Sequence, residues 1–251
     1  MQPMEQFTVK PILEHPLLTI GGHPIYFTNQ SLLMVVVVAA ASLFLTLSMS
    51  RRLLVPSRTQ SMAELSYEFV SNMIHSATGD DGLRFFPFVF TLFFFVLFCN
   101  FFGMIPGSFT VTSQIAVTFS LAMLVILTVI VTGFAKHGIG FFRLFVPDAP
   151  IYLLFLLVPI EIISFLTRPI SLSVRLFANM LAGHTMLAVF GGFVVLLGGA
   201  GGVLSILSIA PMALIVAIML LELLVAFLQA YVFAILTCIY LNEALHLHDH
   251  H

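Results

Sequence analysis

Charged residues are scarce in this chain, and this scarcity excludes most classes of soluble protein. Lysine, arginine, aspartate and glutamate make up 8% of the 251 residues, whereas 60% are hydrophobic. An ordinary soluble domain carries about three times this charged fraction. The net charge is −2 at neutral pH and no basic run exceeds Arg51-Arg52, so nothing supports nucleic-acid binding. We expect an integral membrane protein in a lipid bilayer.

Cysteine is also rare, and recognised catalytic motifs are missing. Cys99 and Cys238 lie in apolar runs without CxxC spacing, which predicts small buried side chains and no disulfide or metal pair. Neither GxxxxGK[ST] nor HExxH occurs, and we expect no cofactor and no catalytic residue. The His-rich end, HLHDHH, is expected to be a solvated tail, with a metal site as the alternative.

Apolar segments long enough to cross a bilayer recur along the chain. A hydrocarbon core of ~30 Å requires about 20 apolar residues in each helix. Before the second span, Ser61 and Glu64 fit a capping box, and apolar residues recur there at helical spacing. This stretch predicts an amphipathic helix in the membrane interface, with a connecting helix packed on protein as the alternative. Single spans are expected at about 32–50, 85–105 and 114–135.

Two longer apolar segments, at about 151–190 and 203–241, flank a Gly-rich stretch. Forty helical residues measure about 60 Å, twice the thickness of the bilayer core. Because no polar loop divides either segment, we expect a hairpin of two long, tilted helices, with Pro169 and Pro211 at kinks or turns.

The sequence therefore predicts an all-α, polytopic membrane protein with about five membrane-embedded helices. We expect a single integral membrane domain over 1–251. Its parts are an external segment over 1–30, three spans plus the interfacial helix over 31–146, and the tilted hairpin over 150–245.

The basic residues predict the orientation of the chain. The links around 106–113 and 191–202 carry no Lys or Arg, whereas the links on the opposite side carry six. Because basic links stay on the inner side of a membrane, we expect an external N-terminus and an internal C-terminus. The six are Arg51, Arg52, Arg58, Arg84, Lys136 and Arg143.

Three charged residues, Glu161, Arg168 and Arg175, fall inside the fourth segment. An arginine at the bilayer centre costs about 2.5–3.5 kcal/mol on insertion scales. Arg175 is too deep to reach the interface easily, so we interpret it as a functional residue. For Arg168, next to Pro169, two interpretations stay equally open: a structural role, in which the side chain reaches the membrane interface or forms an ion pair, and a functional role.

The fifth segment adds Glu222 and Gln229, which lie seven residues apart on one helix face. An antiparallel hairpin with its turn near Gly202 brings three pairs of polar residues level, which favours a proton or ion path over isolated packing contacts. The pairs are Arg175 with Gln229, His184 with Glu222, and Glu161 with Glu243.

The stretches TRPISLSVRLFANMLAGH, ELLVAFLQAYVFAILTCIYL and NFFGMIP resemble subunit a of F-type ATP synthases. The resemblance covers most of the chain except its first 30 residues. It implies that Arg175 faces the carboxylate of the rotating ring of subunit c. It further implies an outer half-channel with Asn179 and Gln229, an acid–base pair of His184 and Glu222 in that half-channel, and an inner half-channel with Glu161 and Ser164.

The function that this resemblance implies is proton translocation by a stator subunit, with no ATP chemistry in this chain. The implied partners are the c-ring, the peripheral-stalk subunit b and the other ATP synthase subunits. The implied location is a bacterial inner membrane, or a mitochondrial one. A secondary transporter or ion channel is the alternative function. A secondary transporter predicts internal repeats with paired broken helices, and the sequence contains none that we can identify.

Overall fold

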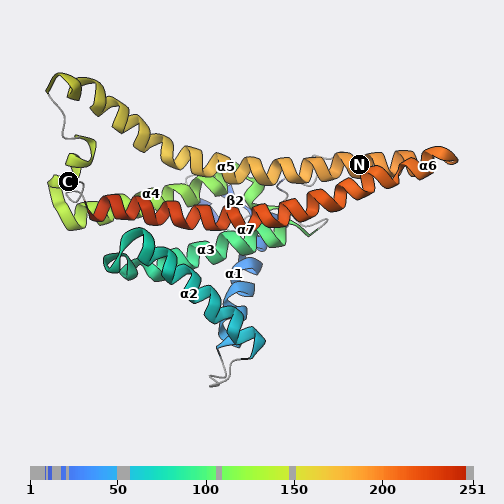
Figure 1. The fold of residues 1–251 in the computed structure, drawn as a ribbon, viewed down its shortest axis with the longest axis horizontal. Helices are drawn as coiled ribbons and strands as arrows, with labels where there is room; N and C mark the ends of the chain where they lie inside the picture. The colour runs from blue at the N-terminus through green and yellow to red at the C-terminus, as the bar shows by residue number, and fades with distance from the viewer. Residues whose placement is uncertain are drawn as a thin grey trace. The chain divides into compact units, whose positions relative to one another are not determined.

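The computed structural model describes residues 18–20, 23–49, 57–105, 109–146 and 151–246, and the isolated residues 9, 11 and 12. Helices dominate this part of the chain (Figure 1). The expected all-α fold is confirmed, with one small addition: strands β1 (Leu18–Ile20) and β2 (His23–Ile25) pair antiparallel within the N-terminal segment 1–30. The α-helices are α1 (Asn29–Ser48), α2 (Arg58–Thr78), α3 (Phe86–Gly103), α4 (Ile115–His137), α5 (Ile151–Gly199), α6 (Val203–Leu207) and α7 (Ile209–Leu245). The 3-10 helices are η2 (Asp80–Phe85), η3 (Val111–Ser113) and η4 (Gly138–Phe145).

Among the described residues, five helical segments are long and apolar enough to cross a membrane, as the sequence predicts. Helices that keep all their backbone hydrogen bonds within one segment are the form in which an open chain can cross lipid. The first three candidate spans have 20, 24 and 28 residues, and the last two have 48 and 41. The two long helices expected at the C-terminal end are therefore present.

Helix α2 begins earlier than the capping box predicted. Ser57 is its N-cap and accepts a hydrogen bond from the backbone N–H of Gln60 at 3.3 Å, so the prediction of a cap at Ser61 is wrong. Ser57 and Gln60 match the same S-x-x-Q pattern one turn upstream, and the earlier serine caps the helix. The Gln60 side chain instead donates to Glu64 at 2.8 Å.

One face of α2 packs on protein, with Ala63, Val70 and Ile74 buried. Met62 and Leu65 are 59% and 64% exposed, which leaves an apolar stripe on its other side. One face of the helix therefore packs on protein, as the alternative predicted. Its position in the membrane interface stays a prediction.

The turn between the two long helices is shorter than the Gly-rich stretch. Helix α5 continues through Pro159 and Pro169 to Gly199. Only Gly201 and Gly202 then adopt left-handed backbone angles, with φ of 71° and 64°. This conformation is easily reached without a Cβ, so the last two glycines of the stretch form the turn. Pro211 lies in the first turn of α7, where a missing N–H is tolerated.

Residue contacts divide the chain into two compact units. Unit 1 comprises Met1–Leu43, Phe95–Gln114 and Leu176–Ala230. Within it, the second half of α5 runs beside α6 and the first part of α7, as the orange ribbons of Figure 1 show. The predicted division into 1–30, 31–146 and 150–245 stays a prediction. The side chains buried in unit 1 include Cys99, Leu176, Met180, Ala226 and Ala230.

Unit 2 comprises Phe44–Phe94, Ile115–Arg175 and Tyr231–His251. It contains α2, α4, the first half of α5 and the end of α7. The Thr78 hydroxyl donates to the Cys238 carbonyl at 3.3 Å and joins the end of α2 to α7. Side chains buried in unit 2 include Val70, Val89, Val125, Leu172 and Phe233.

Candidate functional site

His184 on α5 and Glu222 on α7 meet inside unit 1. His184 Nε2 lies 3.7 Å from Glu222 Oε1, and the two side chains are 10% and 6% exposed. Their contact agrees with the predicted hairpin register. Neither carboxylate oxygen of Glu222 has a hydrogen-bond partner among the described residues. A buried carboxylate without such partners is costly while it is ionised. The imidazole in contact with it can supply a proton, so the pair is suited to proton transfer.

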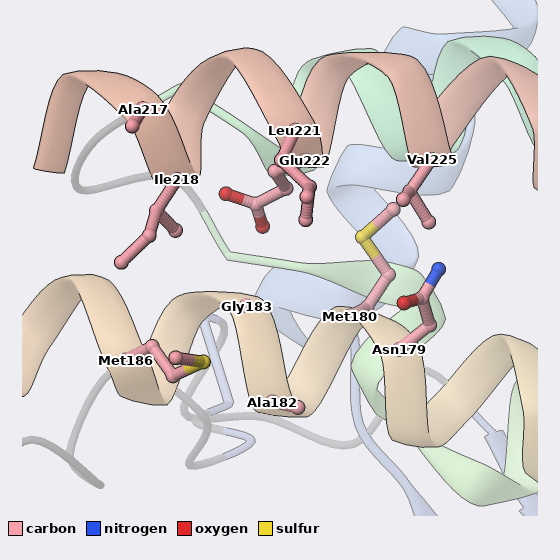
Figure 2. Close-up of a pocket in the computed structure, with 10 residues that line it drawn as sticks. All are labelled: Asn179, Met180, Ala182, Gly183, Met186, Ala217, Ile218, Leu221, Glu222 and Val225. Atoms are coloured by element: carbon pink, nitrogen blue, oxygen red, sulfur yellow. The ribbon is translucent and has the colours of Figure 1, made fainter. Parts of the chain in front are cut away.

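The Glu222 carboxylate points into a cavity of about 330 Å³ between α5 and α7. Figure 2 shows it facing Gly183 across this space, with Asn179 toward one end. A Cβ on Gly183 would lie 2.6 Å from Glu222 Oε1, so the glycine makes room for the carboxylate. Apolar side chains form most of the remaining wall.

Further polar side chains are buried in unit 1, and sequence reasoning missed two of them. The Asn100 amide donates to the Ala226 carbonyl at 3.2 Å. Thr110 Oγ1 lies 3.1 Å from His184 Nε2. Gln229, a predicted site residue, is 5% exposed. Asn100 interrupts a Phe-rich run, and a polar residue inside a span was the signal that would have identified it.

Arg175 on α5 is exposed in the chain. No ion pair joins it to any residue that the structure describes. Asn179 follows one turn later on the same face and is half-buried. That Arg175 and Gln229 lie at the same depth in the hairpin stays a prediction.

The Arg168 guanidinium binds two acidic side chains of unit 2. It bonds to Glu243 on α7, and its Nη2 lies 3.8 Å from Glu161 Oε1 on its own helix. Its guanidinium carbon also lies 4.9 Å from the centre of the Tyr240 ring and 5.6 Å from that of Phe165. Glu161 and Glu243 therefore contact the same cation, in agreement with the equal depth that the hairpin register predicts for them. Ser164, on the same helix as Glu161, is exposed.

Neither cysteine pairs in the structure. Cys99 and Cys238 are free and buried, as the sequence predicts. In the described part of the chain, no group of three or more His, Cys, Asp or Glu side chains could hold a metal ion. The tail after His246, with the remaining histidines of HLHDHH, lies outside the described residues.

Comparison with known proteins identifies the family. The family model of the ATP synthase A chain matches residues 31–242. ATP synthase subunit a of Mesorhizobium japonicum is 58% identical over 247 residues, covering 98% of this chain and 97% of the relative. The protein of the same name from Chelativorans sp. is 60% identical over 97% of both chains, and that from Hyphomonas neptunium is 53% identical over all of this chain and 98% of the relative. The chain therefore belongs to the ATP synthase subunit a family.

Proposed function

We propose that this chain translocates protons as the stator subunit a of an F-type ATP synthase. It is a non-catalytic, multi-pass membrane subunit. In the proposal, two offset half-channels pass protons to and from carboxylates on a ring of subunit c. The proposed partners are this c-ring, the peripheral-stalk subunit b and the other ATP synthase subunits, in a bacterial inner membrane.

The observation that supports this proposal most strongly is that Arg175 lacks an ion-pair partner among the described residues. A guanidinium keeps its charge at any ordinary pH, and a charge at membrane depth requires a partner. Arg175 is exposed and has no ion-pair partner among the described residues. A carboxylate on a neighbouring ring subunit would supply the missing partner.

The uptake half-channel is proposed to lie in unit 1. A proton from outside would reach His184 and Glu222, whose side chains are in contact at 3.7 Å. Asn179 and Gln229 would line the polar path from this pair toward the ring. The cavity in front of Glu222 provides space for the transfer.

The release half-channel is proposed to lie at Glu161 and Ser164 in unit 2. Arg168 holds Glu161 together with Glu243, so two carboxylates share one cation there. This group carries one net negative charge when both carboxylates are ionised. Such a group attracts a proton that leaves the ring and passes it to the inner side.

Rotation follows if protons cannot pass directly between the half-channels. A ring carboxylate protonated through Glu222 becomes neutral and can enter lipid. After nearly a full turn it reaches the release side and loses its proton, and Arg175 keeps it ionised as it passes. The fixed charge also repels protons that would cross directly. Each proton contributes about 2.3 kcal/mol per 100 mV of membrane potential.

Substitution of Arg175 tests the proposal. We expect both Arg175→Ala and Arg175→Lys to abolish proton-driven ATP synthesis in vesicles while the complex still assembles. Lysine fails because its pKa falls readily on desolvation, so it can release its proton and relay others. Near-normal coupled synthesis with Arg175→Lys would contradict the role of a permanent charge.

A further inference from the structure

Thr110 lies in the short described stretch before η3, and its side chain is held firmly in place. The residue is 2% exposed. Its backbone carbonyl accepts a hydrogen bond from the Ser113 hydroxyl at 2.7 Å. A Cβ on Gly103 would lie 2.8 Å from Thr110 Cγ2, so the glycine permits the close approach of Thr110 to the end of α3. Contacts with Ser113 and with Gly103 therefore fix the position of Thr110 and its hydroxyl.

The Thr110 hydroxyl has two partners but one hydrogen. It lies 3.3 Å from the Gly103 carbonyl oxygen and 3.1 Å from His184 Nε2. A hydroxyl has one donor and two acceptor positions. When its hydrogen points to Gly103, the hydroxyl oxygen can accept the Nε2 proton of His184. When Nε2 carries no proton, the hydroxyl can turn and donate to Nε2.

His184 Nε2 also faces Glu222 Oε1, at 3.7 Å. We propose that Thr110 is a positioning residue that holds His184 Nε2 toward Glu222 and keeps it hydrogen-bonded both before and after the proton leaves. The inference rests on the proposed uptake path. The Nε2 proton of an imidazolium leaves its hydrogen bond to Thr110 and passes to the Glu222 carboxylate, so the N–H bond breaks and an O–H bond forms. The neutral imidazole retains its Nδ1 proton, and the Thr110 hydrogen turns from Gly103 to Nε2.

The test compares variants that differ in one hydroxyl. Thr110→Val removes the hydroxyl with little change in volume, and Thr110→Ser retains it. Thr237→Val is the matched control, because Thr237 is 0% exposed and its hydroxyl donates to the Phe233 carbonyl of its own helix at 2.8 Å. The measurement is ATP synthesis by inverted vesicles with an acidic interior, normalised to the assembled complex.

We expect Thr110→Val to lower this rate about tenfold, the change that corresponds to losing one hydrogen bond during transfer. Thr110→Ser and Thr237→Val should both stay within about twofold of the parent, since neither removes a hydroxyl from His184. If Thr110→Val does not assemble, Thr110→Ala removes the same hydroxyl without adding bulk, and the same result is expected.

Three results would overturn the inference: a parent-like rate in the variants without the hydroxyl, an equal loss in Thr110→Ser, or an equal loss in Thr237→Val. The proposed function fails separately. If His184→Ala and Glu222→Ala both retain parent rates, the uptake path itself is wrong, whatever Thr110 does.

Discussion

At the scale of single residues, the space around Glu222 depends on the absence of one side chain. Gly183 faces the carboxylate, and a Cβ there would lie 2.6 Å from Oε1 and 3.0 Å from the carboxylate carbon. Both distances are too short for ordinary contact. Any residue larger than glycine must therefore displace Glu222 relative to His184.

We predict that Gly183→Ala lowers proton-driven ATP synthesis about tenfold to a hundredfold, because a shift of about 1 Å in a reacting group can cost this much. Gly192→Ala is the control. Gly192 lies on the same helix, and a Cβ there meets no atom within 4 Å. ATP synthesis is measured in vesicles with equal amounts of assembled complex. Equal rates for the two variants would contradict a special requirement at Gly183.

The sequence predicted part of this site. The pairing of His184 with Glu222 follows from counting residues on either side of a hairpin turn, because residues equally far from the turn of two antiparallel helices lie at the same depth. Thr110 and Asn100 could not be assigned this way. Their roles depend on how 109–114 and α3 approach α5 and α7 within unit 1, and no helical periodicity encodes that approach. Arg168 was left undecided because the register placed Glu161, and not Arg168, at the depth of Glu243; the bond from Arg168 to Glu243 depends on the reach of a long side chain.

At the scale of helices, Arg168 joins α5 to the end of α7. Its side chain is 15% exposed, whereas those of Glu161 and Glu243 are 37% and 30% exposed. Removing the cation leaves two carboxylates near each other at a partly buried position. Breaking a buried pair costs about 3–5 kcal/mol, and partial exposure reduces this cost.

We predict that Arg168→Gln destabilises this junction by about 1–3 kcal/mol. The temperature of half-inactivation of the assembled complex should then fall by roughly 2–4 °C for each kcal/mol. The double variant Arg168→Gln with Glu243→Gln removes one of the two carboxylates and should recover part of the loss. A parent-like temperature for Arg168→Gln would show that the ion pairs do not stabilise the junction.

Helix existence was easier to predict than helix ends. Long apolar runs allow few other structures in lipid, so all five spans were predicted. The ends depend on local detail. The Gly-rich stretch from 191 was expected to form a turn, but α5 continues to Gly199 because glycine costs only about 1 kcal/mol in a helix and does not forbid it. Likewise Ser57 and Ser61 both fit a cap pattern, and periodicity cannot choose between them.

At the scale of the whole molecule, the proposed orientation is an external N-terminus and an internal C-terminus. We predict that an impermeant maleimide labels a cysteine at Gln6 in intact cells but not one at His248, in a background without Cys99 and Cys238. Both positions lie outside the described residues. The prediction rests on the six basic residues assigned to the inner links. Labelling at His248 and not at Gln6 would reverse the orientation and exchange the uptake and release sides.

The central proposal is that Arg175 keeps the uptake and release paths for protons apart. Synthesis assays alone do not test this separation, because any damage to the complex lowers synthesis. A barrier has a distinct signature: without it, protons still cross, but their flow no longer drives rotation.

The most direct measurement is passive proton conduction by vesicles stripped of the catalytic sector, compared between the parent and Arg175→Ala at equal amounts of assembled membrane sector. Conduction in Arg175→Ala should equal or exceed that of the parent, although the unstripped complex makes no ATP. Membranes that become proton-tight on loss of Arg175 would show that the arginine is part of the conducting path, and the account of a barrier between half-channels would be wrong.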